Sequence, residues 1–276
     1  MTTMSPIRGG ILHLPTTQEG RYSQSLERGL AILTAFTPDR PWMGIAELAE
    51  TLEMSRPTTH RYASTLVALD YLEQGPRRKY RLGMRAGDPG RSALNSTALG
   101  RIAHEHLTKL RDLSTCTASV AVLQGKDIVY VQRARSSLQG ESEVAQRIGR
   151  GSRLPASRTA MGKVLLAYLS DQELGETIDA YFEPADSGEA PAAREKLIAE
   201  LNGIREKGIA IADQLQIEDQ RCVAAPVRCR SSEVLAAVDV AASKSGFSRA
   251  QALEQLAPLV LDCAQQMSEH LGYKAD

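Results

Sequence analysis

The chain has 276 residues, of which 42% are hydrophobic and 24% are charged, with a formal net charge of zero and few aromatic residues. This length favours two domains over one, and the composition is ordinary for a soluble globular protein. Its apolar runs are too short for a membrane span and its first residues lack a cleavable signal peptide, so we expect a cytoplasmic protein without a membrane partner.

Four cysteines are scattered along the chain without a CxxC pair, so neither a disulfide framework nor a zinc site is expected. His104 and His106 are two residues apart, which points them about 200° apart on a helix and disfavours a shared metal ion. We therefore expect no metal and no cofactor.

The first 22 residues mix Gly, Pro, Thr and Ser without a period, which predicts a flexible tail. From Ser23 an apolar stripe at helical spacing predicts a first helix. The stripe consists of Leu26, Leu30, Leu33 and Phe36. Residues 37–41 end this helix, and a second helix has Ile45, Leu48, Ala49 and Leu52 on one face.

Ser55 is predicted to cap a third helix, because serine is a favoured N-cap and Pro57 then falls in the first turn. Tyr62, Leu66 and Leu69 are expected to be its buried residues. Residues 71–73 and 79–82 then predict a hairpin around a Gly-Pro turn, with a basic tip. This order of elements predicts a winged helix-turn-helix over residues 23–84.

The outward face of the third helix is polar and cationic, as expected of a helix that enters the major groove of double-stranded DNA. The predicted DNA contacts are Ser55, Arg56, Pro57, Thr58, Thr59, His60, Arg61 and Ser64 on the helix, and Arg77, Arg78 and Lys79 in the wing. The alternative is a three-helix module that only dimerises. Helical stripes alone do not exclude it, but the cationic outward face disfavours it.

Residues 85–113 are predicted to be a linker and a helix, with Asp88-Pro89-Gly90 as a break before a helix over 93–113. Residues 114–276 predict a second, mixed domain. Its predicted strands are 117–124, 127–135, a weaker one at 143–148, 209–212, 222–228 and 234–242. Its predicted helices are 159–169, 171–182, 192–207, which Gly208 ends, and 249–271.

Three separated motifs resemble the IclR (isocitrate lyase regulator) family over residues 23–272. They are Ile45-Ala46-Glu47-Leu48-Ala49 with residues 54–62, 65–66 and 71–72; residues 151–155 with 160–167; and residues 221–227. Residues 25–30 and the Met161-Gly162 pair resemble its PobR- and PcaR-like branch, which regulates aromatic-acid catabolism. The resemblance implies an α+β fold, in which the winged helix-turn-helix precedes a GAF-like effector-binding domain with a curved antiparallel sheet.

The resemblance also implies a ligand-responsive repressor or activator without catalysis, which forms a homodimer or homotetramer. Its effector would be a small molecule, expected to be a carboxylate. The implied effector contacts are Arg158, Thr159, Ala160, Met161, Asp213, Cys222, Asp239 and Ala241. Ala160 and Met161 would donate backbone N–H groups to the carboxylate near a helix N-terminus.

Three aspartate and glutamate positions depart from the family pattern. Strand alternation places Asp239 among apolar neighbours, so we expect it to pair with Arg158 or to accept a hydrogen bond from the ligand. The alternative is a partly exposed aspartate at a strand end. Glu53 and Asp219 replace common glycines, and a left-handed backbone at Glu53 would cost roughly 1 kcal/mol.

Two other functions stay open. One is a small-molecule enzyme fused to a helical module, although nucleophile–base motifs and phosphate-binding glycine motifs are missing from the sequence. The other is a redox sensor that works through Cys222 and Cys229. For the regulator we expect ligand binding to re-space the two DNA-binding domains of a dimer through the linker, and two-fold symmetry predicts a near-palindromic operator.

Overall fold

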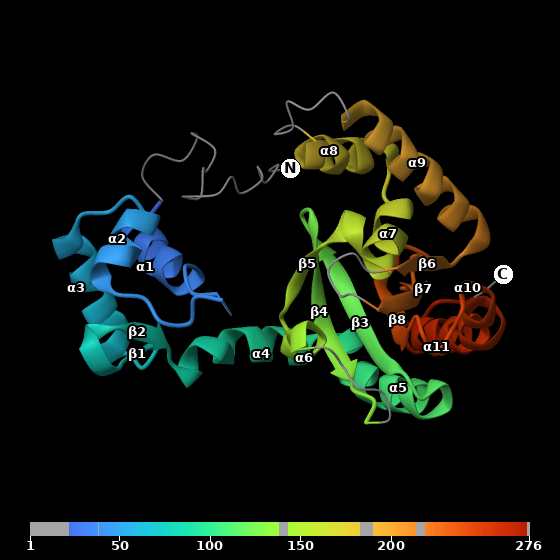
Figure 1. Cartoon of the computed structure of the whole chain (residues 1–276), viewed down its shortest axis with the longest axis horizontal. Helices are drawn as coiled ribbons and strands as arrows, with labels where there is room; N and C mark the ends of the chain where they lie inside the picture. Colours follow the sequence, from blue (N-terminus) through green and yellow to red (C-terminus); the bar gives the residue numbers. More distant parts are fainter. Residues whose placement is uncertain (1–21, 38, 138–142, 183–189, 214–218, 275–276) are drawn as a thin grey trace. The chain divides into compact units, whose positions relative to one another are not determined.

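The computed structural model describes residues 22–37, 39–137, 143–182, 190–213 and 219–274, and the chain divides into two compact units between Ala93 and Leu94 (Figure 1). Each unit has a hydrophobic core of its own. Within the described ranges, no helix is both long enough and apolar enough to cross a membrane.

The N-terminal unit is a helical bundle followed by a hairpin. Its elements are α1 (Gln24–Thr34), α2 (Ile45–Thr51), α3 (Arg56–Ala68), β1 (Leu72–Gln74), η1 (Pro76–Arg78), β2 (Tyr80–Leu82) and η2 (Met84–Gly87). The core of this unit contains Ile32, Phe36, Met43, Leu48, Leu52, Ala63, Leu72 and Tyr80. The predicted helix-turn-helix with a hairpin after it is therefore present.

The apolar stripe of α1 divides into a buried half and an exposed half. Phe36 is buried and Leu33 is half-buried, whereas Leu26 and Leu30 are 63% and 50% exposed. Leu26 and Leu30 therefore belong to the predicted helical stripe but not to the core of this unit.

The segment between the hairpin and the first strand of the second unit contains two helices. α4 (Asp88–Ser96) begins at Asp88, so the Asp-Pro-Gly sequence lies in the first turn of a helix, where proline is tolerated, and is not a break. The break is at Thr97, whose Oγ1 accepts the N–H of Gly100 at 2.9 Å and caps α5 (Ala98–Ser114). The single helix predicted over 93–113 is therefore wrong.

The C-terminal unit is built on an antiparallel sheet of six strands in the order β5-β4-β3-β8-β7-β6, which confirms the predicted α+β fold. The strands are β3 (Thr117–Gln124), β4 (Asp127–Ala134), β5 (Arg153–Pro155), β6 (Ala210–Asp213), β7 (Gln220–Arg228) and β8 (Val234–Ser243). The strand predicted over 143–148 is wrong, because α6 (Glu143–Arg147) is helical.

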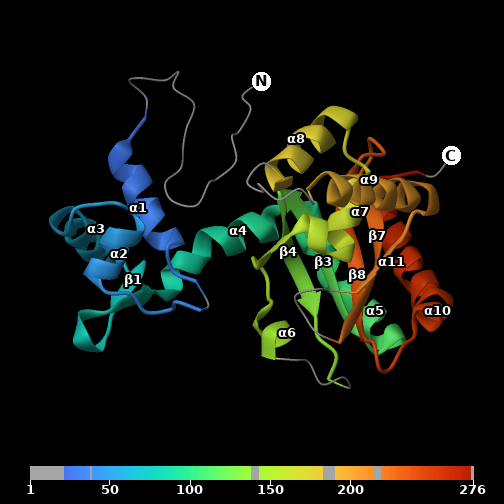
Figure 2. The same cartoon turned by 45° about the horizontal axis from the view of Figure 1, so that its top comes forward.

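Helices cover both faces of this sheet (Figure 2). One face packs against α5 and against α11 (Ala257–His270), which continues α10 (Arg249–Gln251) and η4 (Ala252–Leu256). The other face packs against α7 (Ala160–Ala167), with α8 (Asp171–Phe182) and α9 (Ala190–Lys207) in the same core. Strand alternation therefore decides which helices a side chain of the sheet meets.

Candidate functional site

The N-terminus of α3 has the cap that the sequence predicts. Ser55 Oγ accepts the N–H of Thr58 at 3.3 Å and donates to Thr58 Oγ1 at 2.8 Å, with Pro57 in the first turn. In the turn before it, Glu53 adopts a left-handed backbone with φ of 50°, and Met54 N–H donates to Ala49 O at 2.9 Å. Glu53 therefore occupies a conformation that favours glycine.

The outward face of α3 carries most of the predicted DNA contacts. Ser55, Arg56, Pro57, His60, Arg61 and Ser64 are exposed and Thr58 is half-buried. Thr59 is 0% exposed and its Oγ1 donates to Ser55 O at 3.0 Å, so its inclusion among the contacts is wrong. Leu69 is 48% exposed, so its assignment to the buried face is wrong as well, and Ala63 is buried in its place.

The wing is a short antiparallel hairpin in which Glu73 pairs with Arg81 and Gln74 with Tyr80. Two of its four cations interact within the unit. Lys79 Nζ lies 3.6 Å from Glu47 Oε2, and Arg81 donates to Glu73 Oε2 at 2.6 and 2.8 Å. Among the described residues, neither Arg77 nor Arg78 has an anionic partner, and both are exposed.

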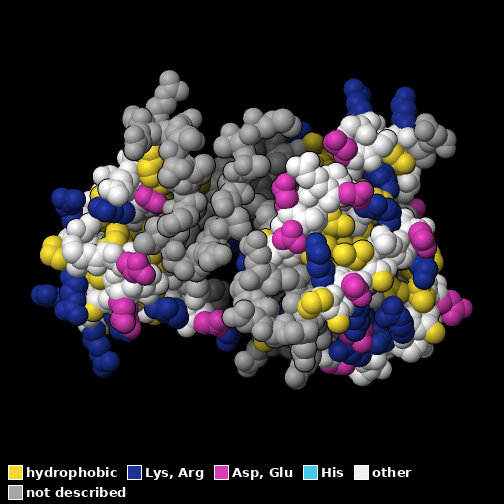
Figure 3. Space-filling model, turned by 90° about the horizontal axis from the view of Figure 1, so that it is seen from above, with side chains coloured by type: hydrophobic (Ala, Val, Ile, Leu, Met, Phe, Trp, Pro, Cys, Tyr) yellow, Lys and Arg dark blue, Asp and Glu magenta, His cyan; other side chains and the backbone are white. Residues whose placement is uncertain are grey.

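Positive charge therefore concentrates at the wing tip and at the start of α3. Figure 3 shows several Lys and Arg side chains gathered at the left-hand edge of the N-terminal unit. Residues 56–68 contain no Asp or Glu, so nothing on α3 itself offsets Arg56 and Arg61. Such a surface complements a polyanion.

In the C-terminal unit, the sheet face beneath α7 holds a row of polar side chains across three strands. Arg133 on β4 lies opposite Ser119 on β3, which lies opposite Asp239 on β8. Asp239 is 2% exposed, and among the described residues its Oδ1 has no hydrogen-bond partner. The alternative of a partly exposed Asp239 is therefore wrong.

Burial dominates the ionisation of Asp239. It raises the pKa of this carboxyl to about 7, although the charge of Arg133 and hydrogen bonds from Ser119 and Cys222 favour the anion. The cation beside Asp239 is thus Arg133, and the predicted pairing with Arg158 is wrong. Arg158 is exposed, at the end of η3 (Ala156–Arg158).

Small side chains surround this row on the same face. They are Ala121, Ala210, Ala212, Cys222, Ala224, Ala237 and Ala241, all buried. Among the predicted effector contacts, Cys222, Asp239 and Ala241 therefore share one face, as strand alternation predicts. The four cysteines are free thiols, with Cys222 buried and Cys229 half-buried.

Asp213 does not belong to this face. It follows Ala212 on β6, so its side chain projects to the other side of the sheet, and it forms a two-pronged ion pair with Arg221 at 2.8 and 3.1 Å. Arg221 holds the pKa of this carboxyl below its usual value. Its predicted side-chain contact with an effector on the α7 face is therefore wrong.

The start of α7 is closely packed. Thr159 Oγ1 accepts the N–H of Gly162 at 3.0 Å, and Ala160 and Met161 are fully buried. A Cβ at Gly162 would lie 2.1 Å from Ala156 O, so only glycine allows α7 to approach η3 this closely. Within the described part of the chain, the N–H groups of Ala160 and Met161 have no acceptor.

Comparison with known proteins covers both units. The model of the IclR helix-turn-helix domain matches residues 25–76, and that of the bacterial transcriptional regulator IclR C-terminal matches residues 91–269. The HTH-type transcriptional regulator XynR of Escherichia coli (strain K12) is 32% identical over 91% of this chain and 98% of its own length. The Pca regulon regulatory protein of Pseudomonas putida is 29% identical, over 92% and 86%.

Solved structures agree. A regulator from Rhodococcus sp. RHA1 has 34% identity and a TM-score of 0.75, with 91% of this chain and 99% of that chain covered. An IclR homologue from Microbacterium hydrocarbonoxydans, complexed with 4-hydroxybenzoate, has the same fold at 20% identity and a TM-score of 0.73, with 90% and 99% covered. The comparisons do not single out the aromatic-acid branch, which stays a prediction.

These relatives are named as transcriptional regulators, and the matches span both the DNA-reading and the sheet-containing units. The chain belongs to the IclR family of bacterial transcriptional regulators, and is a DNA-binding regulator and not an enzyme.

Proposed function

We propose that this regulator reads a near-palindromic operator with the exposed start of α3, while Arg77 and Arg78 contact the phosphate backbone. The observation that carries the proposal is the acid-free outward face of α3, which presents Arg56, His60 and Arg61 beside a capped helix N-terminus. Because its partner is chromosomal DNA, we place its action in the cytoplasm.

Two sets of variants test the two kinds of contact on a duplex from the protein's own promoter region. Arg56→Ala and Arg61→Ala should each weaken specific binding by roughly 1–3 kcal/mol and leave random DNA nearly unchanged. Replacing Arg77 and Arg78 should weaken binding to all sequences and make its salt dependence shallower. Arg153→Ala, an exposed arginine of the other unit, serves as the control. Equal losses on specific and random DNA for the α3 variants would contradict base reading.

A second copy of the chain would cover the exposed apolar face of α1. Leu26 and Leu30 are four residues apart on α1, Tyr22 lies just before its N-cap, and all three are at least half exposed. We propose a homodimer through this face, which can associate further into a tetramer. Leu26→Arg with Leu30→Arg should yield a monomer in light scattering and lower operator affinity. An unchanged oligomer would contradict this interface.

We further propose that a small organic acid binds on the sheet face under α7 and acts as the effector. The free N–H groups of Ala160 and Met161 would hold its carboxylate, and the unpaired Oδ1 of Asp239 would accept a hydrogen bond from a hydroxyl or amine. The homologue complexed with 4-hydroxybenzoate supports this class, because that ligand carries both groups.

Two aspartates on opposite faces of the sheet provide a matched test of this site. Thermal-shift screening with hydroxylated aromatic acids and short-chain acids would first identify a binding compound. Asp239→Ala should then reduce its affinity, whereas Asp213→Ala should not, because Asp213 is on the far face. Equal effects of the two changes would place the ligand elsewhere.

The effect of the ligand on operator binding follows from a shift between two conformations of the protein. A ligand that binds one of them more tightly changes the fraction of protein able to bind the operator, and a ligand with equal affinity for both changes nothing. Operator affinity with and without the compound measures this directly. Whether the result is repression or activation depends on the operator position in the promoter.

A further inference from the structure

Trp42, the single tryptophan of the chain, packs against the base of the wing. A Cβ added to Gly75 would lie 2.4 Å from Trp42 Cζ3, so the ring lies directly on the backbone where the wing loop begins. Only glycine leaves room for this approach.

The same ring contacts the second wing strand. The guanidinium of Arg81 lies 5.0 Å from the centroid of the Trp42 ring, within the range of a cation–π interaction. Arg81 also forms the ion pair with Glu73 across the hairpin. Trp42 therefore contacts the start of the loop at Gly75 and the strand that follows the loop at Arg81.

The backbone next to Trp42 extends the hairpin. Met43 N–H donates to Tyr80 O at 3.0 Å, and Tyr80 N–H donates to Met43 O at 2.8 Å. These two bonds join the segment before α2 to β2. The backbone that carries Trp42 is therefore held in place relative to the wing by hydrogen bonds.

The loop that Trp42 touches has an unfavourable backbone. Arg77 and Arg78 have φ values of 58° and 56°, a left-handed backbone that residues other than glycine rarely adopt. Gly75 N–H donates to Lys79 O at 2.8 Å and closes the loop. Such a conformation persists only where the surrounding structure fixes it, and the Trp42 ring against Gly75 is one such constraint.

We propose that Trp42 is a positioning residue for DNA binding, which holds the wing loop so that Arg77 and Arg78 face the phosphate backbone. This inference rests on the proposed role of those two arginines. It assigns Trp42 no contact with DNA of its own.

The test uses the full-length protein and a promoter duplex at several salt concentrations. Trp42→Ala should weaken binding by about the same factor as Arg77→Ala with Arg78→Ala, and the removal of each arginine–phosphate interaction should lower the salt slope by about 0.9. Adding Trp42→Ala to the double variant should then change little. Trp42→Phe, which keeps an aromatic ring, should restore most of the affinity and slope.

Two further variants separate positioning from general stability. Gly75→Ala keeps the tryptophan but puts a methyl group where its ring lies, so it should reproduce the altered salt slope. Glu73→Gln removes the Arg81 ion pair and keeps the ring contact, so it should retain the slope. Melting temperatures show which variants are folded.

Two results would overturn the inference, and they are distinguishable. If Trp42→Ala and Gly75→Ala leave the salt slope unchanged, or if their losses add in full to those of the arginine variants, Trp42 does not act through the wing. If the arginine variants bind DNA as tightly as the wild type, the proposed role of the wing fails first, and the inference fails with it.

Discussion

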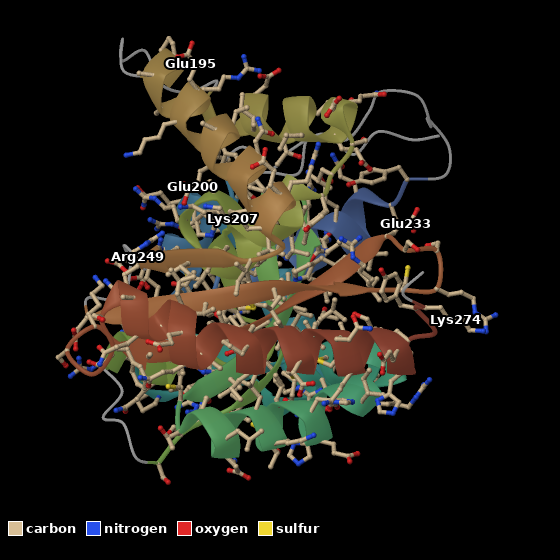
Figure 4. The ribbon with its side chains drawn as sticks, turned by 90° about the vertical axis from the view of Figure 1, so that its right-hand side faces the viewer. Glu195, Glu200, Lys207, Glu233, Arg249 and Lys274 are labelled. Carbon is tan, nitrogen blue, oxygen red and sulfur yellow. The ribbon has the colours of Figure 1, made fainter. Side chains whose placement is uncertain are left out.

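Nε2 of His106 on α5 lies 2.7 Å from Nδ1 of His270 on α11, with the two ring centroids 4.9 Å apart. Figure 4 shows the two helices side by side on one face of the sheet. A hydrogen bond between two ring nitrogens needs one of them to be without a proton, so two charged imidazoles cannot keep this contact.

The pair predicts a loss of stability in mild acid. Burial, and then the charge of His270, lower the pKa of His106 below its ordinary value; Glu105 opposes this and Lys109 adds to it. The unfolded chain therefore binds more protons as the pH falls through about 6.5, and the free energy of unfolding falls with it. Denaturation at pH 7.5 and 5.5 measures the effect, and His106→Gln should reduce the difference. An equal difference in the variant would exclude His106 as its source.

Asp239 predicts the opposite dependence of stability on pH. Its pKa is raised to about 7 from an ordinary value of 3.8, so the folded state retains a proton that the unfolded state releases. Its contribution to stability is full below pH 3.8 and is lost as the pH rises to 7. Asp239→Asn, without bound ligand, should therefore be more stable than the wild type at pH 8, by about 1–3 kcal/mol.

Asp213→Asn is the control for the sign of this pH dependence. The pKa of Asp213 is lowered by Arg221, so its contribution is present above the ordinary pKa and is lost on acidification. That variant should gain nothing at pH 8. A loss of stability at pH 8 in Asp239→Asn would show that the buried carboxylate is better compensated than its contacts indicate.

Gly162→Ala should disturb the start of α7. The added methyl group would meet Ala156 at 2.1 Å, and overpacking of this kind costs roughly 1–3 kcal/mol. The shift should also move the N–H groups of Ala160 and Met161, so effector affinity should fall. Gly203→Ala, inside α9 with no atom within 4 Å of the new methyl group, should be neutral or stabilising. Similar melting temperatures for both variants would contradict this account.

Glu53→Gly should stabilise the N-terminal unit. Glu53 has φ of 50°, which glycine adopts without steric cost, so the gain should reach about 1 kcal/mol after the added freedom of the unfolded chain is subtracted. Chemical denaturation measures it. Glu50→Gly, within the helical part of α2, should instead lose about 1 kcal/mol.

Local signals in the sequence predicted most of the fold. The Ser55 cap, the apolar stripes and the strand alternation depend on near neighbours, and the elements that they define are present. The predictions failed for short segments and for segments at the boundaries of elements. The five residues of α6 are too few to separate a helical period from an extended one, and α4 accommodates its proline in the first turn.

Arg133 shows why part of the candidate site was missed. Plain alternation along β4 puts Arg133 on the opposite face from Tyr130. A bulge at Val131 inserts one residue between the Ala121–Tyr130 and Val120–Gln132 pairs, so Arg133 projects to the same face as Tyr130 and reaches the row of Asp239. No sequence signal marks this bulge. Alternation along β6, in contrast, was enough to separate Asp213 from Ala212.

Exposed apolar side chains are the other source of error. Leu26 and Leu30 fit the helical stripe but are exposed in the single chain, since apolar spacing does not say whether the covering atoms belong to the same molecule.

The alanines on the sheet face under α7 have a consequence for how this regulator can diversify. An alanine side chain has no side-chain torsion to restrict, so the backbone alone sets the contour of this face, and a molecule bound at the proposed site would cost these residues no rotamer entropy. Recognition at the proposed effector site would be altered by exchanging a methyl group for a hydroxyl or a carboxyl at one strand position, while the strands stay in place. Asp239 is a buried carboxyl set among these alanines.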